Sequence, residues 1–402
     1  MLLKKLNQVG KNLGIKLLFN PIKADKIDLL IIAGEASGDE HSAQVVKNVL
    51  RLFPDHNIVA IGGSNLKKSG ANFLFDLVDH AVVGIFEVLK NYWFFKSLFS
   101  TTLRWIIKHK PKVILLVDYP GFNLRLAEAL RKKGISQKGG GNIKVLQYIS
   151  PQLWAWKPKR RFKMANVLDG LAVIFPFEVD CYKDVDLPVF YVGHPYVSSS
   201  FNYPVKFDRI GPLLLLPGSR VQPVQRLLPV FLETAQRLLE TYPQLKISLP
   251  VPNKTIQKLA DEILSQYPEI RGNIKITIGI SGTSARLALM SSGTVSFACA
   301  LSGIPGVIAY RAHPITYFLG RLLINVPFLG MANLILRENP PYPEFIQGKA
   351  NANILCSALM EILAKENGGN GFFEVAKKLK ENLKEPQELG VVDWLSAEAD
   401  WA

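Results

Sequence analysis

The chain has 402 residues but only three cysteines, Cys181, Cys299 and Cys356, which lie far apart and form no C-x-x-C spacing. This number and spacing argue against a disulfide framework and against a zinc site, and they suggest a reducing compartment. The six histidines do not cluster, and no H-E-x-x-H motif occurs. We therefore expect no metal and no cofactor.

No apolar run reaches the ~18–20 residues that a membrane-spanning helix needs. Four lysines interrupt the first twenty residues, and no small-residue cleavage site follows a continuous apolar stretch, which argues against a signal peptide. The pattern fits a basic amphipathic helix instead. Such a helix either packs on its own domain or lies on a membrane surface.

Acidic residues are few beside basic ones, 33 against 48, which leaves a formal net charge of +15. Such an excess favours anionic partners, namely phosphates, nucleic acid or an anionic membrane face. Hydrophobic residues make up 48% of the chain and charged residues 20%, which predicts a folded protein rather than a disordered one.

Short apolar runs alternate with helical segments along both halves of the chain. In the first half we expect strands at residues 28–33, 57–61, 113–117, 145–149, 173–175 and 189–192, and a helix at 41–52. In the second half we expect strands at 212–216, 245–249, 274–280 and 307–310, and a helix at 225–240. Buried strands that alternate with helices predict parallel sheets covered on both faces.

The composition shifts near residue 200, where three serines (198–200), Asn202 and Pro204 indicate a linker. A chain of this length is expected to form two domains. We predict an N-terminal domain at 1–197 and a C-terminal domain at 198–402 whose helical tail can return to the first. The predicted fold is α/β, with two Rossmann-like parallel-sheet domains facing a central cleft at the carboxyl ends of their strands.

A glycine-rich segment, residues 34–39 (GEASGD), follows the first predicted strand and precedes the first helix. Glycines let backbone amides approach a ligand, and a helix N-terminus offers unsatisfied N–H groups to a phosphate. Ser37 or Asp39 can equally be a plain N-cap. The segment is neither G-x-G-x-x-G nor a Walker loop, which argues against a nucleotide dehydrogenase or an ATPase.

Asp118 stands directly after the predicted strand at 113–117, in the segment 118–123 (DYPGFN). A carboxylate at this end of a parallel strand points into the expected cleft. There it can act as the base that takes a proton from an attacking hydroxyl. The alternative is an aspartate that caps the following helix.

Two further turns join a buried strand to a helix in the second half. Residues 216–220 (LPGSR) repeat the phosphate-loop pattern and add Arg220, which can bind a diphosphate bidentately and stabilise the charge of a leaving group. Residues 292–294 (SGT) either complete such a diphosphate pocket or form an ordinary turn and cap.

Aromatic residues are denser between positions 84 and 105 than one core-facing helical stripe needs. The segment is either a surface for acyl chains and anionic head groups or a helix packed on all sides. The residues assigned to this surface are Phe86, Leu89, Trp93, Phe94, Phe95 and Phe99. Residues 148–163 combine aromatic and basic side chains that suit a phosphorylated lipid or a single-stranded nucleic acid, but no nucleic-acid-binding motif accompanies them.

The segments AGEASGD, GIFEVL, DYPGFN, YISPQLWAWKPKR, FPFE, VGHP, LPGSR, SGT and YR occur in this order. Together they resemble the lipid-A-disaccharide synthases, glycosyltransferase family 19, from about residue 31 to residue 347. The resemblance implies a GT-B fold and an inverting hexosyltransferase that uses no metal. It also implies the substrates, UDP-2,3-diacylglucosamine and 2,3-diacylglucosamine 1-phosphate, and the products, a β-1,6-linked lipid A disaccharide 1-phosphate and UDP.

The resemblance carries site residues over position by position. Asp118 and Arg220 match the residues that the family most clearly needs. The donor side comprises Gly218, Ser219, Arg220, Ser292, Gly293, Thr294, Tyr310, Arg311 and Asn333. The acceptor side and phosphate loop comprise Gly34, Glu35, Ser37, Gly38, Asp39, Glu87, Asn123, Trp154 and Trp156. The implied location is the cytoplasm, at the inner face of the cytoplasmic membrane, with no nucleic-acid partner.

Two donor-side positions depart from the family pattern, because Ala298 and Pro223 stand where the family usually has glutamate. Two other interpretations therefore remain open. One is an inactive or repurposed homologue that binds a lipid or a nucleotide without turnover. The other is a different UDP-sugar enzyme, such as an epimerase.

Overall fold

The computed structural model describes residues 19–22, 26–81, 92–197, 201–314, 317–318, 326–365, 368–384 and 390–401. Phe86, Glu87 and Leu89 lie outside these ranges. The described chain forms two compact units. Unit 1 extends to Pro195 and also contains α16 (Val391–Glu398), and unit 2 is Tyr196–Lys384.

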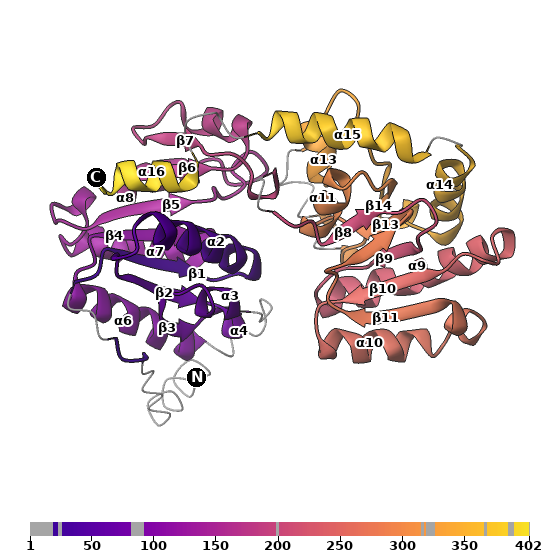
Figure 1. The fold of residues 1–402 in the computed structure, drawn as a ribbon, viewed down its shortest axis with the longest axis horizontal. Coiled ribbons are helices and arrows are strands. Elements are labelled where there is room, and N and C mark those ends of the chain that lie inside the picture. The colour runs from indigo at the N-terminus through magenta and orange to yellow at the C-terminus, as the bar shows by residue number, and fades with distance from the viewer. Residues whose placement is uncertain are drawn as a thin grey trace. The chain divides into compact units, whose positions relative to one another are not determined.

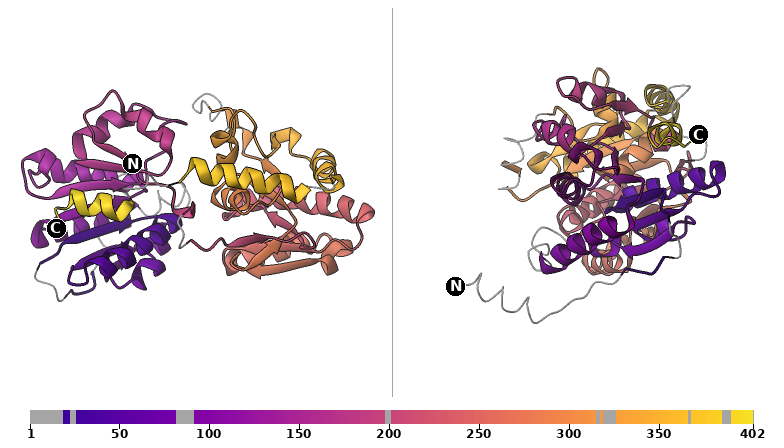
Figure 2. Two further views of the ribbon diagram at one scale, coloured as in Figure 1. Left: turned by 45° about the horizontal axis from the view of Figure 1, so that its top comes forward. Right: turned by 90° about the vertical axis from the view of Figure 1, so that its left-hand side faces the viewer.

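Unit 1 is built on a parallel sheet of seven strands in the order β3-β2-β1-β4-β5-β6-β7. The strands are β1 (Leu29–Ala33), β2 (Ile58–Gly62), β3 (Asn72–Asp76), β4 (Val113–Val117), β5 (Lys144–Tyr148), β6 (Gly170–Val173) and β7 (Val189–Tyr191). Every residue of β1 and β4 is buried, because helices cover both faces of the sheet (Figures 1 and 2).

The helices of unit 1 follow its strands in alternation. They are α2 (Ala36–Leu52), α3 (Ser64–Lys67), α4 (Val78–Ala81), α6 (Tyr92–His109), α7 (Pro120–Lys132), α8 (Arg160–Val167) and α16, with the 3-10 segments η1 (Gln137–Gly139) and η2 (Pro176–Tyr182). Figure 1 shows α16, in yellow, on the sheet of unit 1, although it comes from the far end of the chain.

Unit 2 repeats the design with a six-stranded parallel sheet in the order β11-β10-β9-β13-β14-β15 and a pair, β8 and β12. The strands are β8 (Val205–Phe207), β9 (Leu213–Leu216), β10 (Ile247–Val251), β11 (Ile274–Ile278), β12 (Thr283–Ala285), β13 (Leu287–Ser291), β14 (Gly306–Tyr310) and β15 (Glu344–Ile346). The helices are α9 (Val221–Thr241), α10 (Lys254–Leu264), α11 (Thr294–Leu301), α13 (Met331–Ile335), α14 (Ala352–Ala364) and α15 (Gly368–Asn382); the 3-10 segments are η3 (Pro195–Val197, at the junction of the units), η4 (Pro268–Asn273) and η5 (Gln347–Lys349).

The expected α/β class with two Rossmann-like parallel sheets is confirmed. Four of the expected strands, β5, β6, β7 and β11, end earlier than their apolar runs suggest. β5 stops at Tyr148, because Ile149 adopts a left-handed conformation with φ of 68°. The strand expected at 173–175 is β6, which ends at Val173, because the 3-10 segment η2 begins at Pro176.

Candidate active site

The order of strands in unit 1 reverses between β1 and β4. The chain proceeds outward from β1 through β2 to β3, and from β4 through β5 to β7 on the other side. Ligands of open parallel sheets bind outside the carboxyl ends of the strands at such a switch point. Gly34 follows β1 and Asp118 follows β4, so both lie at this place.

Asp118 is half-buried at the end of β4, and its backbone is held in the left-handed region with φ of 46°. Burial raises the pKa of its carboxyl group to about 6, and the negative charge of Glu35 adds to the rise. A hydrogen bond from the backbone N–H of Tyr119 opposes it. A carboxylate with a pKa near neutrality suits a general base.

The GEASGD segment approaches Asp118 through the Tyr119 ring. A β-carbon on Gly34 would lie 2.1 Å from Cδ1 of Tyr119, so only glycine fits beneath that ring. Glu35 is the exposed N-cap residue of α2, and Ser37 is half-buried in its first turn. Gly38 is buried against Val117. The first-turn amides of α2 therefore face the same edge as Asp118.

Asp39 is 2% exposed, and its carboxylate accepts hydrogen bonds from three backbone N–H groups. The donors are Gly63 at 2.7 Å, Asn65 at 2.9 Å and Leu66 at 3.1 Å. Asp39 therefore holds the start of α3 rather than capping its own helix. Its assignment to a phosphate loop remains a prediction, and these contacts give it a structural role.

A buried carboxyl group, Glu178, lies near Asp118 and escaped the sequence-based assignment. It is 2% exposed and accepts hydrogen bonds from the Phe175 N–H at 3.2 Å and from Nε1 of Trp154 at 3.4 Å. Burial raises the pKa of Glu178 to about 8. The FPFE motif that contains it, a carboxylate among aromatic residues, was the available signal.

In the described part of unit 1, two histidines are buried in segments around this edge. His41 comes from α2 and His194 follows β7. Burial lowers the pKa of His41 to about 4 and that of His194 to about 3, and the nearby His41 lowers the latter further. Both imidazoles are therefore neutral at neutral pH. The sequence motifs assigned neither histidine to the site.

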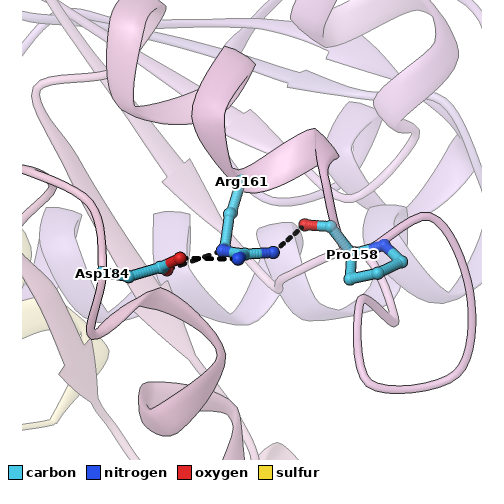
Figure 3. Close-up of polar contacts among 3 residues, drawn as sticks. All are labelled: Pro158, Arg161 and Asp184. Atoms are coloured by element: carbon cyan, nitrogen blue, oxygen red, sulfur yellow. Dashed lines mark hydrogen bonds and ion pairs between the residues drawn. The ribbon is translucent and has the colours of Figure 1, made fainter.

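The basic segment after Trp154 is partly neutralised within unit 1. Arg161 donates to Asp184 at 2.6 and 2.5 Å and to the Pro158 carbonyl at 2.8 Å (Figure 3), and Lys163 pairs with Glu128. Trp156 is 38% exposed, with Nζ of Lys157 4.2 Å from its ring centroid. An exposed aromatic ring flanked by cations thus remains in the segment that follows β5.

The described aromatic residues of α6 pack largely inside unit 1. Phe94 and Phe95 contact each other with ring centroids 5.5 Å apart, and Phe99 lies 5.7 Å from Phe122. Trp93 is half-buried, with Nζ of Lys96 5.0 Å from its ring centroid. These contacts favour the helix packed on several sides, so the acyl surface remains a prediction that also includes residues outside the described ranges.

Unit 2 has its own switch point between β9 and β13, which pair in parallel. Gly218, Ser219 and Arg220 follow β9, and Ser292, Gly293 and Thr294 follow β13. Gly218 has φ of 126°, and a β-carbon there would lie 2.9 Å from Pro223 and 3.6 Å from Oγ of Ser291. The two turns are thus adjacent. Arg220 is exposed as the N-cap residue of α9, which leaves its guanidinium accessible to an anion.

The remaining donor-side residues divide into two kinds. Tyr310 and Arg311 are half-exposed at the end of β14, next to β13. Asn333 is fully buried and exchanges hydrogen bonds with the Tyr342 backbone at 2.8 and 2.9 Å and donates to Glu344 at 2.7 Å. Its amide is therefore used within unit 2, and its role in donor binding stays a prediction.

The described ranges hold neither a candidate metal site nor a candidate membrane-spanning helix. They contain no group of three or more His, Cys, Asp or Glu side chains arranged to hold a metal ion. Within the same ranges, no helix combines the length and apolar character needed to cross a membrane.

Solved structures share this architecture at low sequence identity. A UDP-GlcNAc 2-epimerase from Neisseria meningitidis, bound to UDP-GlcNAc, superposes with a TM-score of 0.55 at 10% identity, covering 89% of this chain and 99% of that one. The glycotransferase of kitacinnamycin gives a TM-score of 0.56 at 12% identity, covering 92% and 99%. At such identities the likeness shows the fold alone, which is GT-B.

Sequence comparison identifies the family. The family model for lipid-A-disaccharide synthetase matches residues 29–389. Lipid-A-disaccharide synthase 1 of Legionella pneumophila subsp. pneumophila is 34% identical over 389 residues, 92% of this chain and 97% of that protein. The lipid-A-disaccharide synthase of Geobacter metallireducens is 35% identical over 344 residues, 82% and 86%. This chain therefore belongs to the lipid-A-disaccharide synthase family of glycosyltransferases.

Proposed function

We propose that the chain transfers the sugar of UDP-2,3-diacylglucosamine to the 6-hydroxyl of 2,3-diacylglucosamine 1-phosphate. The products are the β-1,6-linked lipid A disaccharide 1-phosphate and UDP, formed with inversion at the donor carbon. The observation that carries the proposal is Asp118, a carboxyl group with a raised pKa at the switch point of unit 1. Membership of the family supplies the substrate class.

Asp118 acts as the general base in this reaction. Its carboxylate takes the proton of the acceptor 6-hydroxyl while that oxygen forms a bond to C1 of the donor sugar. The bond between C1 and the diphosphate oxygen breaks, and UDP leaves with the electron pair. A positioned base contributes about 10²–10⁴-fold to such a step.

Arg220 stabilises the diphosphate charge as it develops. The exposed guanidinium stands at the N-terminus of α9, whose first-turn amides add a positive end of a helix dipole. Gly218, two residues before Arg220, itself adopts φ of 126°, a conformation that other residues disfavour. A donor of this kind at a leaving group contributes about 10²–10³-fold.

We further propose that the enzyme works as a peripheral protein at the inner face of the cytoplasmic membrane, where both lipid substrates reside. The net charge of +15 favours an anionic lipid surface. The exposed Trp156, with Lys157 over its ring, is the kind of side chain that lies at membrane interfaces.

The test is turnover of the purified protein with both lipid substrates in detergent, comparing Asp118→Asn and Arg220→Ala with native protein. Asp184→Asn and Arg271→Ala are the matched controls, because both are exposed residues with surface ion pairs. Disaccharide and UDP are expected from the native protein and the controls, with kcat reduced at least about 100-fold in the two site variants. Absence of product from folded native protein would refute the proposal.

A repurposed homologue is the second candidate, favoured by Ala298. This residue is buried in α11, and its methyl group cannot accept a hydrogen bond from a ligand as a glutamate carboxylate can. That candidate predicts UDP-sugar binding without disaccharide formation. Calorimetric titration with the donor, beside the turnover measurement, separates the two.

A further inference from the structure

Three residues at the ends of β4 and β5 adopt the left-handed backbone conformation, which is uncommon for residues other than glycine. Asp118 has φ of 46°, Tyr119 of 47° and Ile149 of 68°. For a β-branched residue such as isoleucine this conformation is a genuine outlier. Such residues persist only where their surroundings hold them, and they gather at functional sites.

Two buried amide side chains hold this backbone in place by hydrogen bonds. Nε2 of Gln147 donates to the carbonyl oxygens of Asp118 and Ile149, both at 3.2 Å. Nδ2 of Asn123 donates to the carbonyl oxygens of Asp118 at 2.8 Å and Val117 at 3.3 Å. One side chain thus ties the end of β4 to the end of β5, and the Asp118 carbonyl receives two donors.

The amide oxygens of the same two side chains accept no hydrogen bond within the described ranges. Gln147 and Asn123 are both 0% exposed, and neither oxygen has a hydrogen-bond partner in the described part of the chain. Burying a polar group without a partner is unfavourable. Gln147 is also flanked by Leu146 and Tyr148 in an otherwise apolar strand core. We therefore attribute the presence of these two amides to the hydrogen bonds that their N–H groups donate to the strand ends.

The backbone N–H of Asp118 is held as well, by the Tyr148 carbonyl at 3.0 Å. The N–H and the carbonyl group of Asp118, which belong to the two peptide groups on either side of its α-carbon, are therefore both held by buried groups. These contacts set the direction in which the Asp118 side chain leaves the backbone. Asn123, expected on the acceptor side, has its amide N–H groups directed to the backbone instead.

We propose that Gln147, together with Asn123, is a positioning residue that holds the Asp118 carboxylate in place for catalysis. The inference rests on the proposed function, in which Asp118 is the base. It assigns a specific part in the reaction to Gln147, a polar residue of β5 that directly precedes the motif beginning at Tyr148.

The experiment compares native protein with Gln147→Met, which keeps the length of the side chain but removes its donors. Asn123 keeps its hydrogen bond to the Asp118 carbonyl in this variant, so we expect the fold to be retained. Val145→Ala is the control, because Val145 is a fully buried apolar residue two positions earlier on β5. We measure kcat, both KM values and the pH dependence of kcat, with circular dichroism as the check on folding.

In Gln147→Met we expect kcat to fall at least tenfold and both KM values to change less than twofold. The acid limb of the pH profile, where kcat falls because Asp118 becomes protonated, should move at least half a pH unit lower. It moves because a carboxylate that is no longer held in place becomes more exposed to solvent, which lowers its pKa. Val145→Ala should keep the native limb. An unchanged limb in Gln147→Met, or a loss of kcat no larger than that of Val145→Ala, would overturn the proposal.

If native protein forms no disaccharide, the proposed function fails and the positioning role is judged separately. Carbon-13 NMR titration of Asp118, identified by its loss in Asp118→Asn, then decides. A lower titration midpoint in Gln147→Met supports the role, and an unchanged midpoint refutes it.

Discussion

At the scale of single residues, Asp118 predicts how activity depends on pH. A base must be deprotonated to work, and burial together with Glu35 raises the pKa of Asp118 to about 6. We expect kcat to be high above this value and to fall about tenfold per pH unit well below it. A steady-state pH profile of kcat measures this. In Asp118→Asn the residual rate should show no such limb, and a native limb near pH 4 would contradict the assignment.

Glu178 predicts how stability depends on pH. Its pKa rises from an ordinary value of 4.5 to about 8 in the folded protein, because burial outweighs the hydrogen bonds that it accepts. Between these values the native state holds a proton that the unfolded state lacks. Stability therefore falls as pH rises from about 4.5 to 8, by up to ~1.4 kcal/mol per pH unit from this residue.

Urea unfolding of Glu178→Gln at several pH values tests this slope. Glutamine has one amide oxygen and cannot accept the hydrogen bonds at both carboxyl-oxygen positions, so a loss of about 1–2 kcal/mol is expected at pH 5. As pH rises, the native protein loses stability from this group and the variant does not, so the difference should shrink and change sign before pH 8. Glu240→Gln is the control, because Glu240 is exposed and its replacement should leave the slope of unfolding free energy against pH as in native protein. If Glu178→Gln kept the native slope, the raised pKa of Glu178 would be wrong.

The residues that sequence patterns locate at the two sites are those whose position follows from strand ends alone. Asp118 and Arg220 are of this kind. Asp39 and Asn333 carry the same residue types, but their partners lie in segments 24–27 and 9–11 residues away along the chain. Gln147 and Glu178 could not be assigned to the site from sequence either. Their roles depend on burial and on hydrogen bonds to residues distant in the chain, which the sequence pattern does not show.

At the scale of elements, the loop between β9 and α9 depends on Gly218. Alanine there is strained by φ of 126° and places its β-carbon 2.9 Å from Pro223. We expect Gly218→Ala to raise the donor KM by roughly tenfold and to lower stability by about 1–3 kcal/mol. Gly272→Ala, where a β-carbon meets nothing within 4 Å, is the control. Equal donor KM values in both variants would refute a role for this loop in donor binding.

Most strands were predictable because their apolar runs are rich in branched residues, as in β4. β13 was missed because its sequence, LALMS, contains no β-branched or aromatic residue. Its neighbours impose the strand, since β9 and β14 pair with it on both sides. Tertiary pairing thus decided what propensity could not, and β13 is the strand that carries the SGT turn.

At the scale of the whole molecule, the chain returns to unit 1 at its end. In α16, Trp394 and Leu395 are buried, and Lys144 of β5 pairs with Glu398 at 2.7 Å. Trp401 contacts Phe53, with ring centroids 5.6 Å apart. These contacts indicate that α16 stabilises unit 1, although the first part of that unit ends at Pro195 and α16 begins only at Val391.

All six tryptophans belong to unit 1, so tryptophan fluorescence reports its unfolding while circular dichroism reports both units. Leu395→Ala in α16 should destabilise unit 1 by about 2–5 kcal/mol and move the fluorescence transition to lower urea. Leu359→Ala in α14, equally buried in unit 2, should leave fluorescence unchanged and shift only the dichroism transition. A Leu395→Ala variant with native fluorescence unfolding would show that α16 does not support unit 1. A single transition shifted alike by both substitutions would show that the two units unfold together.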